Sequence, residues 1–211
     1  MQIAILLYDR FTALDAVGPY DVLGHLPGAE VVFVAERPGP VGNEVGSLSL
    51  VAGAALADVP RPDVIVVPGG PGQTAHMGDG PVLRWLRAVD AHSTWTASVC
   101  SGSLLLAAAG LLTGRMATSH WLVRDLLADH GAIPIADRFV FDGKYVTAAG
   151  VSAGLDMAFA LAGRIAGDAV AQVIQLAHEY DPRPPYASGN PDTAPRAIAD
   201  AVLARRADIV S

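Results

Sequence analysis

The sequence predicts an α/β protein with one doubly wound, mostly parallel sheet and helices on both faces. Short β-branched or apolar runs alternate with helical patterns along the chain, which is typical of parallel sheets linked by helices. Hydrophobic residues make up 52% of the 211 residues and charged residues only 17%, as strands buried on both faces require. No repeat or long linker interrupts the chain, so we expect a single domain over 1–211, with its core at about 2–180.

The first half of the chain alternates strands and helices. The apolar run 2–8 predicts a buried strand, 31–34 a second, and the β-branched run 64–67 a third. Val17 to Leu23 follow a helical pattern in which we place Pro19 in the first turn. Residues 37–51 are rich in Gly and Pro and predict an edge hairpin, and 80–92 form an amphipathic pattern that begins with a proline.

The second half continues the alternation. The segment 94–112 changes from a β pattern to an Ala- and Leu-rich helix. Residues 114–119 predict a strand, 122–130 a helix, and 139–147 a hairpin with a type I′ turn at Asp-Gly. Helices are predicted at 150–167 and from 168 to about 178, followed by a proline-rich excursion at 181–195 and a surface helix at 196–207.

Composition excludes several functions. The formal net charge is −7 and no Lys/Arg block is present, which argues against a nucleic-acid partner. A single cysteine excludes an internal disulfide framework and a multi-cysteine zinc site, and the histidines show no ligand spacing. The N-terminus does not resemble a signal peptide, and no apolar run reaches about 18 residues. We expect a cytoplasmic protein with no metal and no membrane partner.

Cys100 lies where the strand pattern changes to the helix pattern. A residue at such a position stands on a sharp turn, and the free N–H groups of the first helical turn point towards it. We expect this environment to lower the pKa of the thiol, as in a nucleophile elbow with sulfur in place of oxygen. The alternative is an inert, buried cysteine.

Two further features accompany this turn. Gly69, Gly70 and Gly72 follow a buried strand and allow backbone N–H groups to approach a ligand closely, although no nucleotide-binding motif is present. Asp15 falls at or just before the start of a helix, where a helix N-cap is the simpler alternative to a functional acid.

Several segments together resemble the DJ-1/PfpI superfamily and, within it, the isocyanide hydratases. The resemblance covers about residues 2–195. Its most specific parts are the cysteine turn and the closing Tyr-Asp-Pro-Arg-Pro-Pro sequence. The segments that carry it are Leu14–Leu23, Val67–Gly70, Ser98–Ser103, Ala108–Leu112, Ala117–Trp121, Thr147–Asp156 and Tyr180–Pro191.

The resemblance implies a flavodoxin-like homodimer with Cys100 as the reactive cysteine. It implies that Asp15 hydrogen-bonds to the sulfur and that the N–H groups of Gly70 and Ser101 form an anion-binding pocket. Gly69 and His120 are expected to line the site. Protease- and glyoxalase-like members carry His after the cysteine, where this chain has Ser101.

The main hypothesis is hydration of a small-molecule isocyanide to an N-formamide without a cofactor. The Cys100 thiolate would add to the terminal carbon while Asp15 protonates it as a general acid. Water would then attack the thioimidate, with Asp15 as a base. The alternatives are a glyoxalase or deglycase acting on dicarbonyls, and a redox sensor in which Cys100 is oxidised to a sulfinic acid.

Overall fold

A computed structural model describes residues 1–207, and residues 208–211 of the expected domain lie outside the described part. Seven strands form one sheet in the order β10-β11-β7-β6-β1-β2-β5, in which only β10 runs antiparallel to its neighbour. The strands of this sheet are β1 (Gln2–Leu6), β2 (Glu30–Ala35), β5 (Ala54–Ala55), β6 (Val64–Val67), β7 (Trp95–Val99), β10 (Phe139–Asp142) and β11 (Tyr145–Ala148).

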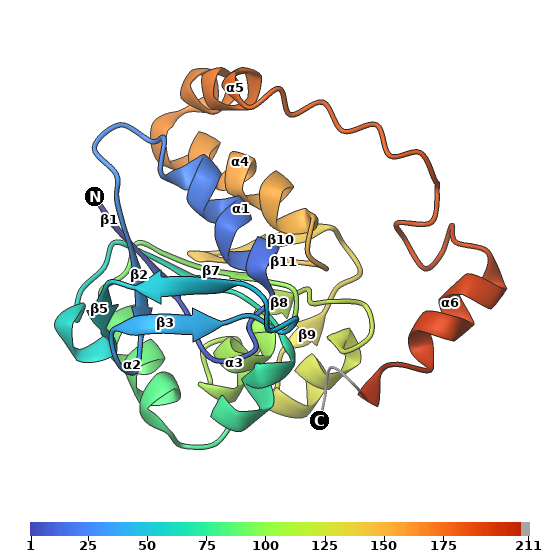
Figure 1. Ribbon diagram of the computed structural model, residues 1–211, viewed down its shortest axis with the longest axis horizontal. Helices are drawn as coiled ribbons and strands as arrows, with labels where there is room; N and C mark the ends of the chain where they lie inside the picture. The colour runs from blue at the N-terminus through green and yellow to red at the C-terminus, as the bar shows by residue number, and fades with distance from the viewer. Residues whose placement is uncertain (208–211) are drawn as a thin grey trace.

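Helices lie on both faces of the sheet, which confirms the predicted fold class (Figure 1). One face carries α1, α4 and α5, and the other carries α2, α3 and the 3₁₀ segment η3. The helical segments are α1 (Ala13–Leu23), η1 (Leu56–Asp58), η2 (Pro71–His76), α2 (Pro81–Asp90), α3 (Gly102–Ala108), η3 (Arg124–His130), α4 (Ala153–Ala166), α5 (Asp168–Ala177) and α6 (Arg196–Leu203).

The strand order reverses direction between β1 and β6. The chain builds outward from β1 through β2 on one side and through β6, β7 and β11 on the other. Every residue of β6 is buried, as is β1 after Gln2, because both faces are covered. Ligands of such open sheets bind outside the carboxyl ends of the strands at the point of reversal. Helix α1 follows β1, and the loop to η2 follows β6, at this point.

Helix α1 begins earlier than the sequence pattern predicts. It starts at Ala13, so Asp15 lies within the first turn and Pro19 in the interior, where we had expected Asp15 at the helix start and Pro19 in the first turn. Proline removes only one intrahelical hydrogen bond at this position, and packing overrides that loss. A Cβ atom on Gly18 would lie 3.4 Å from Leu155, so α1 and α4 approach each other closely.

The predicted strand at 114–119 is largely wrong. Only Met116–Ala117 form a strand, β8, which pairs with β9 (Ile133–Pro134) outside the main sheet. Side chains replace the expected ladder, because the N–H of Met116 donates to Asp142 Oδ2 at 2.9 Å and that of Thr118 to Thr147 Oγ1 at 2.8 Å.

Two other local predictions need correction. The predicted helix at 122–130 is the 3₁₀ segment η3. The hairpin β10–β11 turns at Gly143 and Lys144, since Asp142 pairs with Tyr145. Only Gly143 of these two has a positive φ, +63°, so the turn is not type I′. The expected edge hairpin is present as β3 (Gly39–Gly42) and β4 (Ser49–Ala52).

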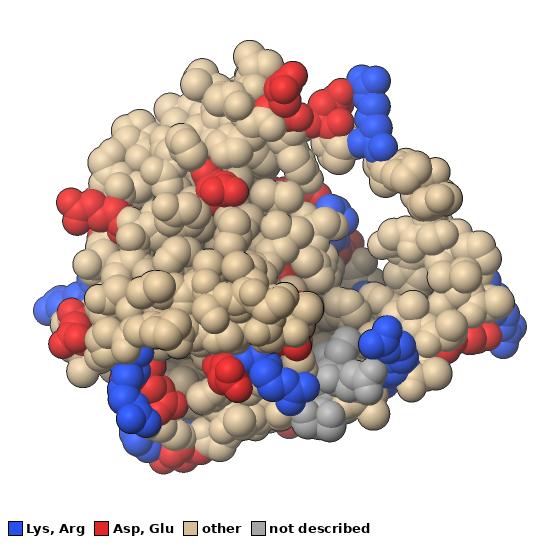
Figure 2. Space-filling model, in the orientation of Figure 1, with Lys and Arg blue, Asp and Glu red and all other residues tan. Residues whose placement is uncertain are grey.

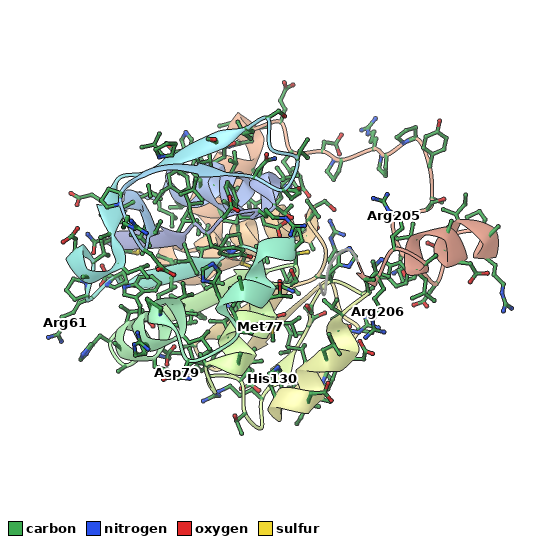
Figure 3. The ribbon with its side chains drawn as sticks, turned by 60° about the horizontal axis from the view of Figure 1, so that its bottom comes forward. Arg61, Met77, Asp79, His130, Arg205 and Arg206 are labelled. Atoms are coloured by element: carbon green, nitrogen blue, oxygen red, sulfur yellow. The ribbon has the colours of Figure 1, made fainter. Side chains whose placement is uncertain are left out.

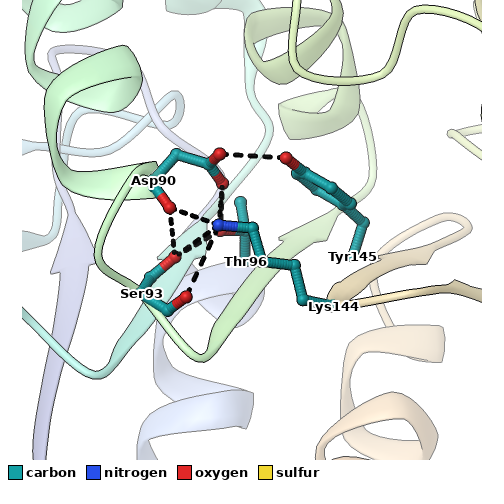
Figure 4. Close-up of polar contacts among 5 residues, drawn as sticks. All are labelled: Asp90, Ser93, Thr96, Lys144 and Tyr145. Carbon is teal, nitrogen blue, oxygen red and sulfur yellow. Dashed lines mark hydrogen bonds and ion pairs between the residues drawn. The ribbon is translucent and has the colours of Figure 1, made fainter.

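A buried polar cluster closes the amino end of the sheet (Figure 4). The Asp90 carboxylate at the end of α2 accepts hydrogen bonds from Thr96 Oγ1 at 2.7 Å and Tyr145 OH at 2.9 Å, and Lys144 Nζ lies 3.2 Å from it. Ser93 bonds to Thr96 within the same cluster. The cluster joins α2, β7 and the β10–β11 hairpin at the end of the sheet opposite the cysteine.

Candidate active site

Cys100 stands between β7 and α3 in a strained conformation. Its φ is +58°, which is uncommon for a residue with a side chain, and only 5% of the residue is exposed. Gly102 permits this turn, because a Cβ atom there would lie 2.1 Å from the carbonyl oxygen of Val67. The backbone N–H of Cys100 bonds to the carbonyl oxygens of Ala148 and Ala149, both at 3.0 Å. The sulfur-bearing turn is therefore fixed by both neighbouring strands.

The carboxyl group of Asp15 is fully buried and interacts with the Cys100 thiol. Its Oδ2 accepts the N–H of Gly69 at 3.0 Å, while Oδ1 makes no hydrogen bond within the described part of the chain. Burial is the main cause that raises the pKa of Asp15 to about 7, against the opposing effects of Gly69 and Cys100. A buried oxygen without a partner at such a site is free to exchange a proton with a ligand.

The predicted direction of the cysteine pKa is wrong. Burial raises the pKa of Cys100 well above its ordinary value, and the negative charge of Asp15 raises it further. The N–H groups of Val151 and Ser101 donate to the sulfur and lower its pKa, but these effects are smaller. Because burial and the charge of Asp15 both disfavour the thiolate, Cys100 keeps its proton when Asp15 loses its own above about pH 7.

Ser101 closes the glycine-rich turn onto the cysteine. Its hydroxyl accepts the N–H of Gly70 at 3.1 Å, and the buried amide of Gln73, with its nitrogen turned inward, donates to the Ser101 carbonyl oxygen at 3.1 Å. A Cβ atom on Gly69 would lie 2.7 Å from the Ser101 hydroxyl, so only glycine fits there. The N–H of Gly70, expected in an anion-binding pocket, is thus occupied by Ser101.

His120 lies beside the loop that follows β11. Its ring touches Gly150, where a Cβ atom would lie 2.7 Å from Cδ2, and its Nδ1 accepts the N–H of Leu122 at 3.3 Å. Burial lowers the pKa of His120, so the ring is neutral at pH 7. The structure therefore brings His120 near the site as a neutral ring.

The sequence reasoning missed four residues of this site. Tyr8 donates to the carbonyl oxygen of Pro68 at 2.8 Å, and its burial, followed by the charges of Asp15 and Cys100, raises its pKa. Ser119 donates to the Cys100 carbonyl oxygen at 3.0 Å. Gln73 and Val151 complete the set, and the φ of Val151, +28°, is strained for a β-branched residue. No spacing signals these contacts, since each joins separate segments.

A cavity of about 350 Å³ lies beside residues 149–151, and neither Cys100 nor Asp15 is among its lining residues. Its floor includes Ala149, Gly150 and Val151, which flank Cys100 in space through the hydrogen bonds given above. The remaining lining residues are His120, Trp121, Arg124, Ala136, Asp137, Arg138, Ser152, Gly189, Asn190, Pro191 and Asp192. The cavity thus reaches from the cysteine loop to the C-terminal excursion.

A second cavity of about 380 Å³ lies between the carboxyl ends of β1 and β2 and the β3–β4 hairpin, and it includes neither Cys100 nor Asp15. The residues that the structure describes contain no cluster of three His, Cys, Asp or Glu side chains able to hold a metal ion. No helix among them is long and apolar enough to span a membrane.

Comparison with known proteins identifies the family of the chain. A model of the DJ-1/PfpI family matches residues 1–164. The chain is 45% identical to the isonitrile hydratase of Pseudomonas putida over 207 residues, which cover 98% of this chain and 90% of that protein. It is 27% identical to a glutathione-independent glyoxalase of Caenorhabditis elegans, over 66% of this chain and 75% of the other.

A solved structure of a ThiJ/PfpI family protein from Pseudomonas syringae is also similar. It has a TM-score of 0.96 and 40% identity, and the match covers 99% of this chain and 87% of that one. The family match and the near-complete overlap with these relatives confirm the resemblance: the chain belongs to the DJ-1/PfpI family.

Proposed function

We propose that the protein is an isocyanide hydratase, which adds water to R–NC and releases the N-substituted formamide R–NH–CHO. The observation that carries the proposal is the buried pair of Cys100 and Asp15, which holds one proton, in a chain 45% identical to an isonitrile hydratase over nearly its whole length. The terminal carbon of an isocyanide accepts both a nucleophile and a proton, and this pair supplies both.

In the first step the S–H group adds across the terminal carbon. Asp15, ionised above its pKa of about 7, takes the thiol proton as the sulfur attacks and delivers it to the same carbon. An S–C bond and a C–H bond form, the S–H bond breaks, and the product is the thioimidate Cys100–S–CH=N–R. Asp15 returns to its ionised form without any net change.

In the second step a water molecule attacks the thioimidate carbon. Asp15 accepts one proton from the water and passes it to the imine nitrogen, which gives the adduct Cys100–S–CH(OH)–NH–R. Asp15 then moves the hydroxyl proton to the sulfur as the S–C bond breaks, which releases the formamide R–NH–CHO and restores the thiol. The N–H groups of Ser101 and Val151 stabilise negative charge on the departing sulfur. These two reaction steps need no metal or organic cofactor. The N–H of Gly69 keeps the Asp15 carboxyl group oriented in both steps.

Further parts of the proposal concern assembly and location. We expect a homodimer, because Leu14 and Tyr20 on α1 are large apolar residues with exposed fractions of 42% and 41%. A cytoplasmic location suits a protein whose only cysteine must remain a free thiol. Light scattering coupled to size exclusion measures the mass, and a mass equal to one chain would refute the dimer.

The test compares two substrates and three proteins. Purified wild type is expected to convert phenyl isocyanide to N-phenylformamide and to leave methylglyoxal unchanged, while Cys100→Ala and Asp15→Ala lose activity almost completely. Thermal unfolding establishes that both variants fold. Full isocyanide turnover by either folded variant would refute the mechanism, and turnover of methylglyoxal alone would favour the glyoxalase alternative.

A further inference from the structure

We infer that the C-terminal excursion and α6 form the outer wall of a substrate subsite beside Cys100, which accepts an aromatic substituent with a neutral hydrogen-bonding group at its far end. This inference rests on the proposed function and extends it to the class of isocyanide. It concerns the arm, defined as residues 181–206.

The first observation is the composition of one cavity. The body of the protein supplies the floor through Ala149–Val151 and one side through His120 and Trp121. The arm supplies the opposite side through residues 189–192. Cys100 itself does not line this cavity, but Ala149 and Val151, which do, bond to its backbone and sulfur. We therefore place the substituent of a substrate attached to the sulfur in the space between body and arm.

The second observation is how the arm returns to the body. Figure 2 shows open space between the body and the segment that leads away from α5. Residues of α6 share a small cavity with Trp121 of the body. Arg206, labelled in Figure 3, donates from Nη2 to both carboxylate oxygens of Asp125 in η3, at 2.9 and 2.8 Å. Ile198 and Val202 of α6 face Trp121 across a small cavity of about 70 Å³.

Two contacts anchor the arm: the ion pair between Arg206 and Asp125, and the contact between α6 and Trp121. An exposed ion pair contributes little by itself, so the apolar contact of α6 with Trp121 is the more important part. Trp121 lines both cavities and thus connects the position of α6 to the shape of the subsite.

The lining residues indicate the chemistry of the substituent. The rings of His120 and Trp121 lie at 28° to each other with centroids 6.2 Å apart, which offers flat apolar surface to an aromatic ring. The rim beyond them carries Arg124 and Arg138 but also Asp137 and Asp192. An ion of either sign would meet a like charge there, whereas a neutral amide finds donors and acceptors in these side chains and in Asn190.

The first experiment uses the thiol and requires no hydratase activity. Cys100 is the only cysteine, so alkylation reports on this site alone. The probes are iodoacetamide and para-carbamoyl iodoacetanilide, which react at the same carbon and release iodide. The alkylation rate of Cys100 by each probe is divided by the rate at which the same probe alkylates glutathione. By this corrected rate, wild type is expected to react about tenfold faster with the anilide than with iodoacetamide. The preference falls to about threefold or less in Asn190→Ala and in the double variant Val202→Asp/Arg206→Ala, which releases α6.

The second experiment measures turnover of para-carbamoylphenyl isocyanide and methyl isocyanide. The ratio of their kcat/KM values is expected to fall about tenfold in Trp121→Leu and in Val202→Asp/Arg206→Ala, which corresponds to about 1.4 kcal/mol. Arg196→Ala is the matched control, since its side chain is 94% exposed on the same helix and it leaves both rates unchanged.

The outcomes separate this inference from the proposed function. If wild type hydrates isocyanides but neither ratio changes in the arm variants, or both substrates lose rate equally, the subsite inference is wrong. If wild type hydrates no isocyanide yet prefers the anilide in an arm-dependent way, the subsite stands and the proposed function fails.

Discussion

At the scale of single residues, the proposed chemistry depends on two buried acids, Cys100 and Asp15. Neither Cys100 nor Asp15 would ionise readily alone, because burial raises the pKa of both. In the proposed mechanism the proton passes from the sulfur to the Asp15 carboxylate and on to the substrate. Such a pair can move a proton to the isocyanide carbon without exchange with water.

The pH dependence of turnover follows from this pairing. The reactive form has lost one proton from the pair, and the pKa of Asp15 is about 7. We therefore expect kcat/KM to rise tenfold per pH unit below pH 7 and to level off above it, measured with an aryl isocyanide that has no ionising group. A rate that falls as pH rises through 7 would mean that the carboxylic acid is the reactive form from the start.

The stability of the fold is expected to respond to the same carboxyl group. The pKa of Asp15 is about 7 in the folded protein and near 3.8 in the unfolded chain, so the folded state binds more protons between these values. The free energy of unfolding therefore decreases as pH rises from 4 to 7, by at most about 4 kcal/mol. Asp15→Asn removes this dependence.

Urea denaturation checks this expectation. Near pH 4 the free energies of unfolding of Asp15→Asn and wild type should differ only by a constant offset. As pH rises to 8, the variant should become more stable relative to wild type. If the difference in unfolding free energy between the two proteins stays constant over this range, the fold does not raise the pKa of Asp15.

At the scale of elements, close helix packing brings Asp15 to the sulfur. Helix α4 crosses β7 at Gly154, where a Cβ atom would lie 2.8 Å from Val99 Cγ1. Gly154→Ala is expected to destabilise the protein by about 1–3 kcal/mol, because Val99 is fully buried and cannot move away freely. Denaturant unfolding measures this loss.

Gly163 provides the control on the same helix. A Cβ atom there meets only the end of the exposed Asp168 side chain at 3.1 Å and Ala171 at 3.8 Å. Gly163→Ala should therefore be neutral or stabilising, since alanine favours helix by about 1 kcal/mol. Equal destabilisation by both substitutions would contradict the assigned role of Gly154.

The polar cluster at the far end of the sheet has its own prediction. Asp90→Asn removes the charge that pairs with Lys144 and weakens the bonds from Thr96 and Tyr145. We expect a loss of about 3 kcal/mol in unfolding free energy with unchanged catalytic parameters at 25 °C. Loss of catalytic rate in the folded variant would show that this cluster influences the distant site.

The sequence predicts elements well where pattern and packing agree. The apolar run of β6 and the elbow at Cys100 are of this kind, because buried parallel strands and sharp strand–helix turns leave local signals. The start of α1 and the strand at 114–119 are wrong, because contacts from distant segments decide them. Pro19 is tolerated because it is buried in α1, which packs on α4, and the side chains of Asp142 and Thr147 replace a ladder at 116–118.

At the scale of the whole molecule, the site joins segments from the entire length of the chain. The elbow and the glycine turn were predictable because each is continuous in sequence. The raised pKa of Cys100 was not, because burial by the complete fold outweighs the local effect of the helix start. The position of residues 189–192 beside the loop 149–151 was also not predictable, since the closing segment resembles the family in sequence but meets that loop only in three dimensions.

The central claim is that sulfur bonds to the isocyanide carbon before water does. Acid quench of wild type under saturating aryl isocyanide, followed by mass analysis of the peptide that contains Cys100, tests it directly. The account predicts a mass gain equal to the whole isocyanide on that peptide, and formamide production at the uncatalysed rate in Cys100→Ala. Formamide production by folded Cys100→Ala at the wild-type rate, with no adduct in wild type, would contradict it.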